Sequence, residues 1–338
     1  YWLNGLVIFF GLIIIRYFFL NATDKIEEVD PALAGFLGGA NLPIIFSWAV
    51  GGFFAGGVAF VIGKVALGLR SDYLAIVTLG ISEIVVSVLK HEEWLSRGVK
   101  NVIGLKRPVP YEINLQTSDW FINMVTWFNS SKLNDIIDLD QKQEMLTNLV
   151  IDSSSLFVKL NYAVLFFIVM IVIYYFANKA QVSPWGRMMR AIRDNEVSAN
   201  AMGKDIVKQH LIIFVIGAAI VGVAGAMLVT LDGLFTPSGY RPLRFTFIIW
   251  IMVIVGGSGN NLGAIFGGFV IWFAWIEVAP LTTFLINLFT SGLDPQNAIR
   301  LHLLDSVPYF RYLLMGMVLL LILRYRPKGI IPEKVRHS

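Results

Sequence analysis

The sequence Leu156–Ala177, LFVKLNYAVLFFIVMIVIYYFA, decides the class of fold. It is almost wholly apolar and is as long as the roughly 20 residues that an α-helix needs to cross the hydrocarbon core of a bilayer. Other stretches share this character, although the sixth and eighth are short; the set is 2–20, 42–63, 73–89, 156–177, 211–231, 245–257, 262–285 and 312–323. The sequence therefore predicts an all-α, polytopic integral membrane protein with about eight transmembrane helices.

The composition agrees with a membrane protein. Of the 338 residues, 56% are hydrophobic and 15% are charged, whereas soluble chains carry about a quarter charged residues. The chain has no cysteine, which excludes disulfides and cysteine-bound zinc or iron–sulfur centres. Because the first residue is Tyr1 rather than Met, we expect natural sequence to precede it.

The basic residues predict the topology, because Lys and Arg gather in cytoplasmic loops. They form three groups: Lys64 and Arg70; Lys179, Arg187, Arg190, Arg193, Lys204 and Lys208; and Arg324, Arg326, Lys328, Lys334 and Arg336. With eight spans and both termini in the cytoplasm, all three groups face inward and the segment 91–155 faces outward. We expect one transmembrane domain over 1–331, with a cytoplasmic loop at 178–210 and a cytoplasmic tail at 332–338.

The charged sequence Ser183–Gly203, SPWGRMMRAIRDNEVSANAMG, lies between apolar spans and predicts a short amphipathic helix. Ser183 suits the N-cap, Pro184 the first turn, and Gly203 the left-handed turn that ends the helix. Its apolar face is Trp185, Met188, Met189 and Ile192, and the opposite face carries Arg187, Arg190 and Asp194. Two interpretations remain open: a handle that a separate motor protein grips, or a surface helix that binds anionic lipid.

Glu83 is the most unusual residue within a predicted span, where a charge costs about 2.5–3.5 kcal/mol on insertion scales. Ser87 lies one turn further along and Gly80 one turn back, which makes a polar stripe. Either the carboxyl meets substrate or water in a pathway, or a buried partner or a proton stabilises it for packing. Thr78, Glu83 and Ser87 are our candidates for a substrate pathway.

The outer segment 91–155 contains two amphipathic patterns. Trp120, Met124, Trp127 and Phe128 form an aromatic stripe that suits the membrane interface, and Ile136, Ile137, Met145, Leu146 and Leu149 predict a second helix. The acidic residues Asp135, Asp138, Asp140 and Glu144 are compatible with a cation site. A solvated helix face is the favoured interpretation, since no calcium-loop spacing accompanies them.

Small residues recur at four-residue spacing and predict close helix packing; they are Gly52 and Gly56, then Ala218, Gly222 and Ala226, then Gly263 and Gly267. The glycine-rich sequence Gly256, Gly257, Ser258, Gly259, Asn260 joins two spans and lacks the lysine of a phosphate-binding loop, so it predicts a tight cytoplasmic turn. The chain has no GxSxG or HExxH motif, and its four histidines are scattered. We therefore predict no catalytic residue and no metal site.

Five sequences together resemble a known family. They are LRSDYLAIVTLG at 69–80, HEEWL at 91–95, the sequence Ser183–Gly203, VIVGGSGNNLG at 253–263, and RPKGIIP at 326–332. In this order and spacing they resemble the inner-membrane permease subunits of branched-chain amino acid ABC importers, of the LivM type. The chain departs from the family in one place. Ahead of the loop equivalent to 22–42 the family has a Gly- and Phe-rich span, whereas here 2–20 leads almost directly into the acidic residues 24–30. Either a span is missing from this chain or its N-terminal part is remodelled.

The resemblance implies ABC importer permease architecture in a bacterial inner membrane, with 91–155 in the periplasm. Besides the bilayer, it implies a second related permease subunit, two ATP-binding-cassette ATPases and a periplasmic solute-binding protein as partners, and no nucleic acid. ATP and Mg²⁺ would be bound by the ATPases, and this chain would carry no cofactor. The implied ATPase-coupling residues are Ser183, Pro184, Gly186, Arg187, Arg190, Arg193, Asp194, Glu196 and Gly203.

The expected function is therefore passage of branched-chain amino acids through a permease that is not itself an enzyme. A permease of the same family for urea or short amides is the nearest alternative. An ion-coupled secondary transporter is a more distant one.

Overall fold

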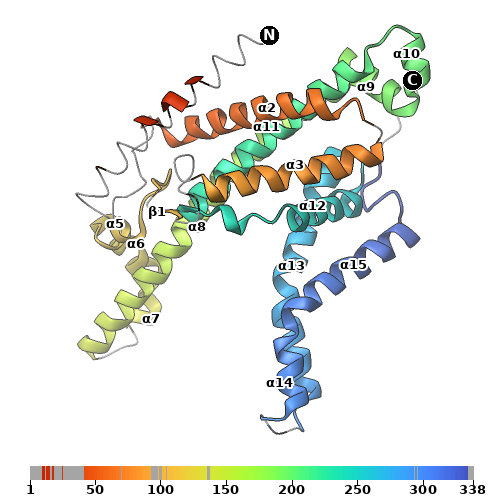
Figure 1. The fold of residues 1–338 in the computed structure, drawn as a ribbon. Coiled ribbons are helices and arrows are strands. Elements are labelled where there is room, and N and C mark those ends of the chain that lie inside the picture. The colour runs from red at the N-terminus through yellow and green to blue at the C-terminus, as the bar shows by residue number, and fades with distance from the viewer. Residues whose placement is uncertain are drawn as a thin grey trace. The chain divides into compact units, whose positions relative to one another are not determined.

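A computed structural model of the chain describes residues 10–11, 13–15, 17–18, 25, 42–69, 71–92, 98, 101–103, 105–134, 138–292, 294 and 296–333 (Figure 1). The chain consists of two compact units, Tyr1–Gly239 and Tyr240–Ser338. Most of the first predicted span, 2–20, lies outside the described residues, as does the segment 26–41 that bears on the missing span.

The first unit contains α2 (Ile44–Ala66), α3 (Ser71–His91), β1 (Val102–Ile103), α5 (Glu112–Gln116), α6 (Asp119–Phe128), α7 (Ser130–Asn134), α8 (Leu139–Val182), α9 (Pro184–Asp194), α10 (Glu196–Ala201), α11 (Ile206–Asp232), β2 (Leu234–Phe235) and the 3₁₀ turn η1 (Pro237–Gly239). The second contains α12 (Pro242–Gly256), α13 (Asn261–Phe289), α14 (Ala298–Asp305) and α15 (Val307–Tyr325).

Among the described residues, 6 helices are long and apolar enough to cross a membrane: α2, α3, α8, α11, α13 and α15. The prediction of an all-α, polytopic membrane protein is therefore confirmed. Helix α12 is apolar but has only 15 residues, about 22 Å of helix, so it is shorter than the roughly 30 Å of a hydrocarbon core. The predicted total of eight spans requires that α12 and the first predicted span, 2–20, also cross the membrane; most of 2–20 lies outside the described residues.

Helices α2 and α11 pack closely and antiparallel, because small residues line their contact (Figure 1). A Cβ added at Gly52 would lie 2.8 Å from the Ala219 carbonyl oxygen, and one at Gly63 would lie 2.6 Å from Leu211 Cδ1. A side chain at Gly52 would therefore force the helices apart, whereas one at Gly63 would require the Leu211 side chain to move. The predicted close packing is confirmed, although Ala219 meets Gly52 and Gly56, one position from the predicted Ala218.

Helix α8 has 44 residues, so it is about 66 Å long and twice as long as a hydrocarbon core is thick. The predicted boundary between an outer segment and a span, at 155/156, lies inside this helix, which passes through it without a break. No Gly or Pro occurs between Leu139 and Val182, and the Asp138 side chain accepts a bond from the Asp140 amide at the helix start. Nothing in the polar half therefore ends the helix.

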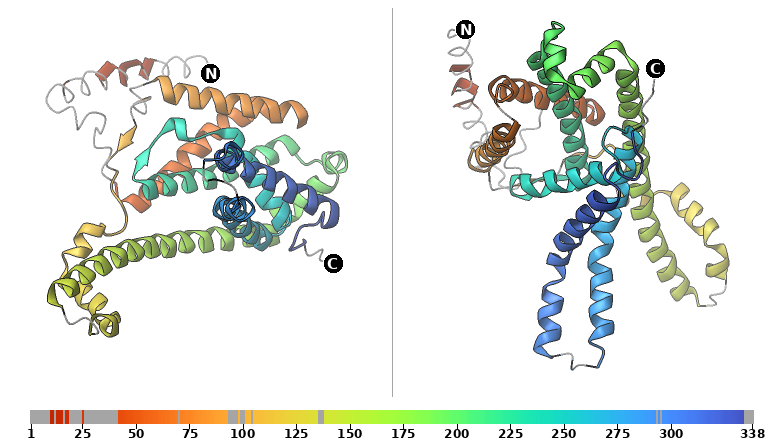
Figure 2. Two further views of the ribbon diagram at one scale, coloured as in Figure 1. Left: turned by 90° about the horizontal axis from the view of Figure 1, so that it is seen from below. Right: turned by 90° about the vertical axis from the view of Figure 1, so that its right-hand side faces the viewer.

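The polar half of α8 forms a small core with α5 and α6, which fold back along it (Figure 2). Phe121 of α6 is fully buried and makes an edge contact with Phe157 of α8, at 5.6 Å between ring centroids. Gln116 Nε2 of α5 donates to the buried Ser154 Oγ at 2.9 Å. The predicted second amphipathic helix is confirmed for Met145, Leu146 and Leu149, whereas Ile136 and Ile137 lie outside the described residues.

In the second unit, α12 and α13 form a hairpin whose turn is Gly257–Asn260, and α15 runs beside α13 (Figure 2). Gly257 has φ 122° and Gly259 has φ 93°, which L side chains rarely adopt. Ile251, Ile271 and Met315 fill the core between the three helices. A Cβ at Gly267 would lie 2.8 Å from Gly256 Cα, so the predicted close packing at Gly263 and Gly267 is also confirmed.

Candidate functional site

Helix α9 begins as the sequence predicts. The Ser183 hydroxyl accepts a bond from the Gly186 amide at 3.2 Å, and Pro184 occupies the first turn. On the apolar face Ile192 is buried, and Trp185 Nε1 donates to Gln209 Oε1 of α11 at 3.0 Å. These contacts fix α9 against the end of α8 and the start of α11.

The predicted single helix to Gly203 is wrong in one respect, because Asn195 divides it into α9 and α10. Asn195 has extended backbone angles, φ −158° and ψ 99°, and its side chain accepts a bond from the Ser198 amide at 3.0 Å. It therefore caps a second helix instead of continuing the first. Gly203 does end this second helix, with φ 75°, as predicted.

Arg187 and Arg190 bind the end of α8. Arg187 Nη1 donates to the Val182 carbonyl at 3.2 Å, and Arg190 Nη1 donates to the Gln181 carbonyl at 3.1 Å. The last carbonyls of a helix lack partners within it and carry partial negative charge, so cations suit them. Gly186 lies directly against the Ala180 and Gln181 carbonyls, where a Cβ would collide with them. These contacts attach α9 to the end of α8.

The outer surface of the loop carries exposed charges and exposed apolar side chains. Arg193 Nε pairs with Asp194 at 3.2 Å, with both side chains more than half exposed, and Glu196 lies 3.8 Å from His210 Nε2. Val197 is 81% exposed and Met202 is 80% exposed. Neither residue was predicted as part of the site; their signal is an apolar residue at each end of α10, Val197 in its first turn and Met202 directly after it.

Contacts within the first unit place its basic connections at one end. The close approach of Gly63 to Leu211 brings the end of α2, with Lys64, to the same end of the helix pair as the start of α11, with Lys208. At the opposite end of α11, Phe235 pairs with Val102 of the outer segment. This arrangement agrees with the predicted topology, in which the basic connections share one side and 91–155 lies on the other.

The pathway candidates on α3 lie on an uncovered helix, and none of the residues in its apolar window is buried. The Thr78 hydroxyl donates to the Leu74 carbonyl at 2.9 Å, and Ser87 Oγ lies 3.4 Å from His91 Nδ1. Glu83 is exposed and has no hydrogen-bond or ion-pair partner in the part of the chain that the structure describes. No residue that the structure describes is therefore the buried partner considered for Glu83.

The turn at Gly256, Gly257, Gly259 and Asn260 binds the C-terminal sequence. Asn260 Oδ1 accepts bonds from the Leu262 and Gly263 amides, at 3.0 and 3.3 Å, and Asn260 Nδ2 donates to the Pro332 carbonyl at 3.2 Å. The Ile330 and Ile331 amides donate to the last carbonyls of α12, both at 2.9 Å. The structure thus joins the two motifs at 253–263 and 326–332.

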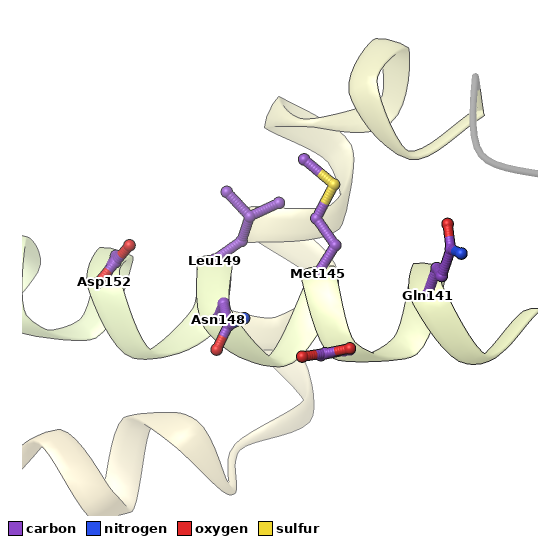
Figure 3. Close-up of a pocket in the computed structure, with 6 residues that line it drawn as sticks. Gln141, Met145, Asn148, Leu149 and Asp152 are labelled. Atoms are coloured by element: carbon purple, nitrogen blue, oxygen red, sulfur yellow. The ribbon is translucent and has the colours of Figure 1, made fainter.

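An open groove of about 400 Å³ lies on the outer half of α8, lined by Gln141, Glu144, Met145, Asn148, Leu149 and Asp152 (Figure 3). All six come from one helix, so the groove is a surface feature and not an enclosed site. Asp138, one of the acidic residues considered for a cation, serves as the cap of α8. The described residues include no group of three or more His, Cys, Asp or Glu side chains that fits a metal ion.

Comparison with known proteins assigns the family. The family model described as "Branched-chain amino acid transport system / permease component" matches residues 8–323. A probable branched-chain amino acid transport permease protein LivM from Methanocaldococcus jannaschii is 31% identical over 162 residues, 48% of this chain and 44% of that protein. The high-affinity branched-chain amino acid transport system permease protein LivM of Escherichia coli is 22% identical over 283 residues, 84% of this chain and 56% of that protein.

The corresponding LivM protein of Salmonella typhimurium is 24% identical over 281 residues, 83% of this chain and 56% of that protein. The chain thus spans about half the length of the curated relatives it matches. No solved structure matches it. The relatives are named as transport permeases and not as enzymes, and the chain belongs to the family of branched-chain amino acid transport system permease components.

Proposed function

We propose that this chain is the permease subunit of an ATP-driven importer that moves branched-chain amino acids across a bacterial inner membrane. The observation that carries the proposal is the family match over residues 8–323, which includes every candidate span of the described chain except the last two residues of α15. The fixed attachment of α9 to the end of α8 adds a physical route by which an external protein can move a span.

In this proposal the driving force enters at the loop Ser183–Gly203. Two separate ATPases bind ATP and Mg²⁺, and this chain itself holds no cofactor. Arg193, Asp194 and Glu196 supply polar contacts to an ATPase, and the exposed Val197 and Met202 supply apolar ones. Ser183, Pro184 and Gly203 set the shape of the loop, while Gly186, Arg187 and Arg190 attach it to α8.

Closure of the ATPases then displaces α9, and α8 follows as one continuous helix. Such a displacement changes transport only if each state of the importer makes different contacts with the ATPases and with the solute. The loop, the turn Gly256–Asn260 and both termini lie in the cytoplasm in this proposal. The segment 91–155 lies in the periplasm, where a solute-binding protein delivers the amino acid.

The uncovered helix α3 fits the proposed partner set, because a second related permease subunit would cover it. Thr78, Glu83 and Ser87 would then line the pathway between the two subunits. An isolated charge facing lipid is costly, whereas one that faces a water-filled pathway is not. The carboxylate of Glu83 is therefore better explained by a pathway than by the bilayer.

The test is uptake into proteoliposomes that contain the complete importer and its binding protein. We expect leucine uptake that requires ATP, is inhibited by isoleucine and valine more strongly than by urea, and survives collapse of the proton gradient. Uptake of urea that leucine does not inhibit would favour the urea and amide alternative. Uptake without the ATPases that stops when the proton gradient is removed would favour the ion-coupled one.

A further inference from the structure

Two arginines in the second unit lie against one buried tryptophan. The Cζ atom of Arg244, on α12, lies 5.1 Å from the ring centroid of Trp275, on α13, and the Cζ atom of Arg311, on α15, lies 5.6 Å from it. Trp275 is only 5% exposed. The predicted spans begin at Phe245 and Tyr312, one residue after each arginine, but both helices start earlier and include them.

Both arginines lie far along their helices from the polar turn and the basic tail. Along α12, Arg244 is about 18 Å of helix from Gly256 at the polar turn. Along α15, Arg311 is about 20 Å from Arg324, which lies near the same end. Trp275 is about 21 Å along α13 from its start. A hydrocarbon core is roughly 30 Å thick, so a membrane whose surface lies at the turn Gly257–Asn260 would hold all three residues inside its core.

The two positive charges are not neutralised within the described residues. Neither arginine forms an ion pair or a hydrogen bond there, and the Nε atom of each is buried without a partner. Glu277 lies only two residues from Trp275 but is exposed on another side of α13, and it pairs with neither. A guanidinium stays charged, so the cost of burying it can fall only if an anion or a π-system is nearby.

The contact with Trp275 lowers only part of the cost of burying the two guanidinium charges. A guanidinium that stacks on a ring uses its flat face and leaves the N–H groups at its edge available. Those donors match the two oxygens of a carboxylate. Around them lie further rings: Tyr312 makes an edge contact with Trp275 at 5.5 Å, and Phe245 lies 5.7 Å from Arg244. A few fixed polar groups among apolar walls are typical of a small-molecule site.

We propose that Arg244 and Arg311 bind the carboxylate of the transported amino acid, while the rings around Trp275 contact its apolar side chain. This rests on the proposed function, and it names the part of the solute that the permease recognises. Lipid phosphate and a carboxylate of a neighbouring subunit offer similar chemistry, so the experiment has to separate these sources from the solute.

The test is equilibrium binding of radiolabelled leucine to the purified importer in nanodiscs, without the binding protein. We expect Arg244→Gln and Arg311→Gln each to raise the Kd of leucine about 10- to 100-fold, the loss expected for hydrogen bonds to a charged group. Leucinol, which keeps the ammonium group and side chain but lacks the carboxylate, should compete poorly with leucine in the wild type. In the variants this preference for leucine should largely disappear.

Arg241→Gln is the matched control, because Arg241 precedes α12, is exposed and makes no capping bond. It should leave both the Kd and the preference unchanged. Arg244→Lys should retain part of the affinity, since it keeps the charge but loses the two-pronged geometry.

Three results would overturn the inference while leaving the proposed function intact, provided that the wild type takes up leucine. The first is an unchanged Kd in both glutamine variants or no leucine binding by the wild type. The second is loss of the second permease subunit on size-exclusion chromatography, which would assign the arginines to an interface. The third is a defect that appears only in nanodiscs with anionic lipid, which would assign them to lipid. A wild type that takes up no amino acid would instead refute the proposed function.

Discussion

Helices α2 and α3 follow each other in the chain and their most apolar 18-residue stretches are almost equally apolar, yet these stretches are buried very differently. In their most apolar windows, 22% of α2 is buried and none of α3. The buried residues of α2 repeat at three and four positions; they are Trp48, Gly52, Gly56, Ala59, Gly63 and Ala66. Helix α3 has no such stripe, and its one glycine, Gly80, has nothing within 4 Å of a Cβ.

The difference teaches that hydropathy identifies a span but does not identify its neighbour. In lipid, apolar side chains gain little by leaving the bilayer, so close backbone approach and polar contacts decide which helices pair. Helix α2 has the small residues for such an approach and pairs within the chain. Helix α3 carries polar residues, including Glu83, and has no such close partner among the described residues of the first unit.

The largest effect should come from filling the contact between α2 and α11. Gly52→Leu places a side chain where a Cβ would lie 2.8 Å from a backbone oxygen, so the helices must separate. Overpacking of this kind costs about 1–3 kcal/mol, and more where backbone must move. We expect a fall of several degrees in the melting temperature of the detergent-purified chain, or failure to accumulate in the membrane.

Gly57→Leu is its control on the same helix, because nothing lies within 4 Å of a Cβ at Gly57. This variant should melt within a degree or two of the wild type. Equal destabilisation by both variants would mean that helix propensity, and not the contact with α11, accounts for the effect.

A smaller effect on folding but a clear effect on transport should follow from Glu83→Gln in α3. Since α3 has no buried residue in its apolar window, the stability of the isolated chain should change by less than about 0.5 kcal/mol. ATP-driven leucine uptake should fall roughly tenfold if the carboxylate faces the pathway. Normal uptake would remove Glu83 from the pathway, and a large loss of stability would show that α3 is packed after all.

The effect that involves the fewest residues should occur at the end of α10. Gly203→Ala puts a Cβ at φ 75°, which costs roughly 1–2 kcal/mol, although there is open space around it. The amides near Lys204 should exchange hydrogen about tenfold faster, while the rest of the chain is unchanged. Gly217→Ala, in the middle of α11 with open space around it, should not accelerate exchange there.

Much of the fold could be predicted from the sequence, because long apolar runs and helix caps are local signals. Ser183, Pro184 and Gly203 occupy the cap and turn positions expected of them. The length of α8 escapes prediction because the amphipathic helix and the apolar span are predicted as separate elements, although no residue between them ends a helix. The pattern around Asn195 suggests one continuous helix, whereas its side chain caps the next.

The parts of the site that could not be predicted depend on contacts between distant residues. Arg244 and Arg311 each precede an apolar run, and a charge in that position normally marks the end of a span. Only the packing of α12, α13 and α15 shows that they share Trp275. The exposure of Val197 and Met202 likewise depends on how α9 and α10 lie against α8 and α11.

The central claim is that ATPases move this chain through the loop Ser183–Gly203, and site-directed cross-linking tests it most directly. The chain has no cysteine, so Val197→Cys introduces its only thiol. In the assembled importer, a thiol-to-amine cross-linker should join this position to an ATPase subunit, whereas Trp127→Cys, exposed on α6 in the segment proposed to be periplasmic, should give no such product. An intact importer in which Val197→Cys does not cross-link to an ATPase, or in which Trp127→Cys does, would contradict the account.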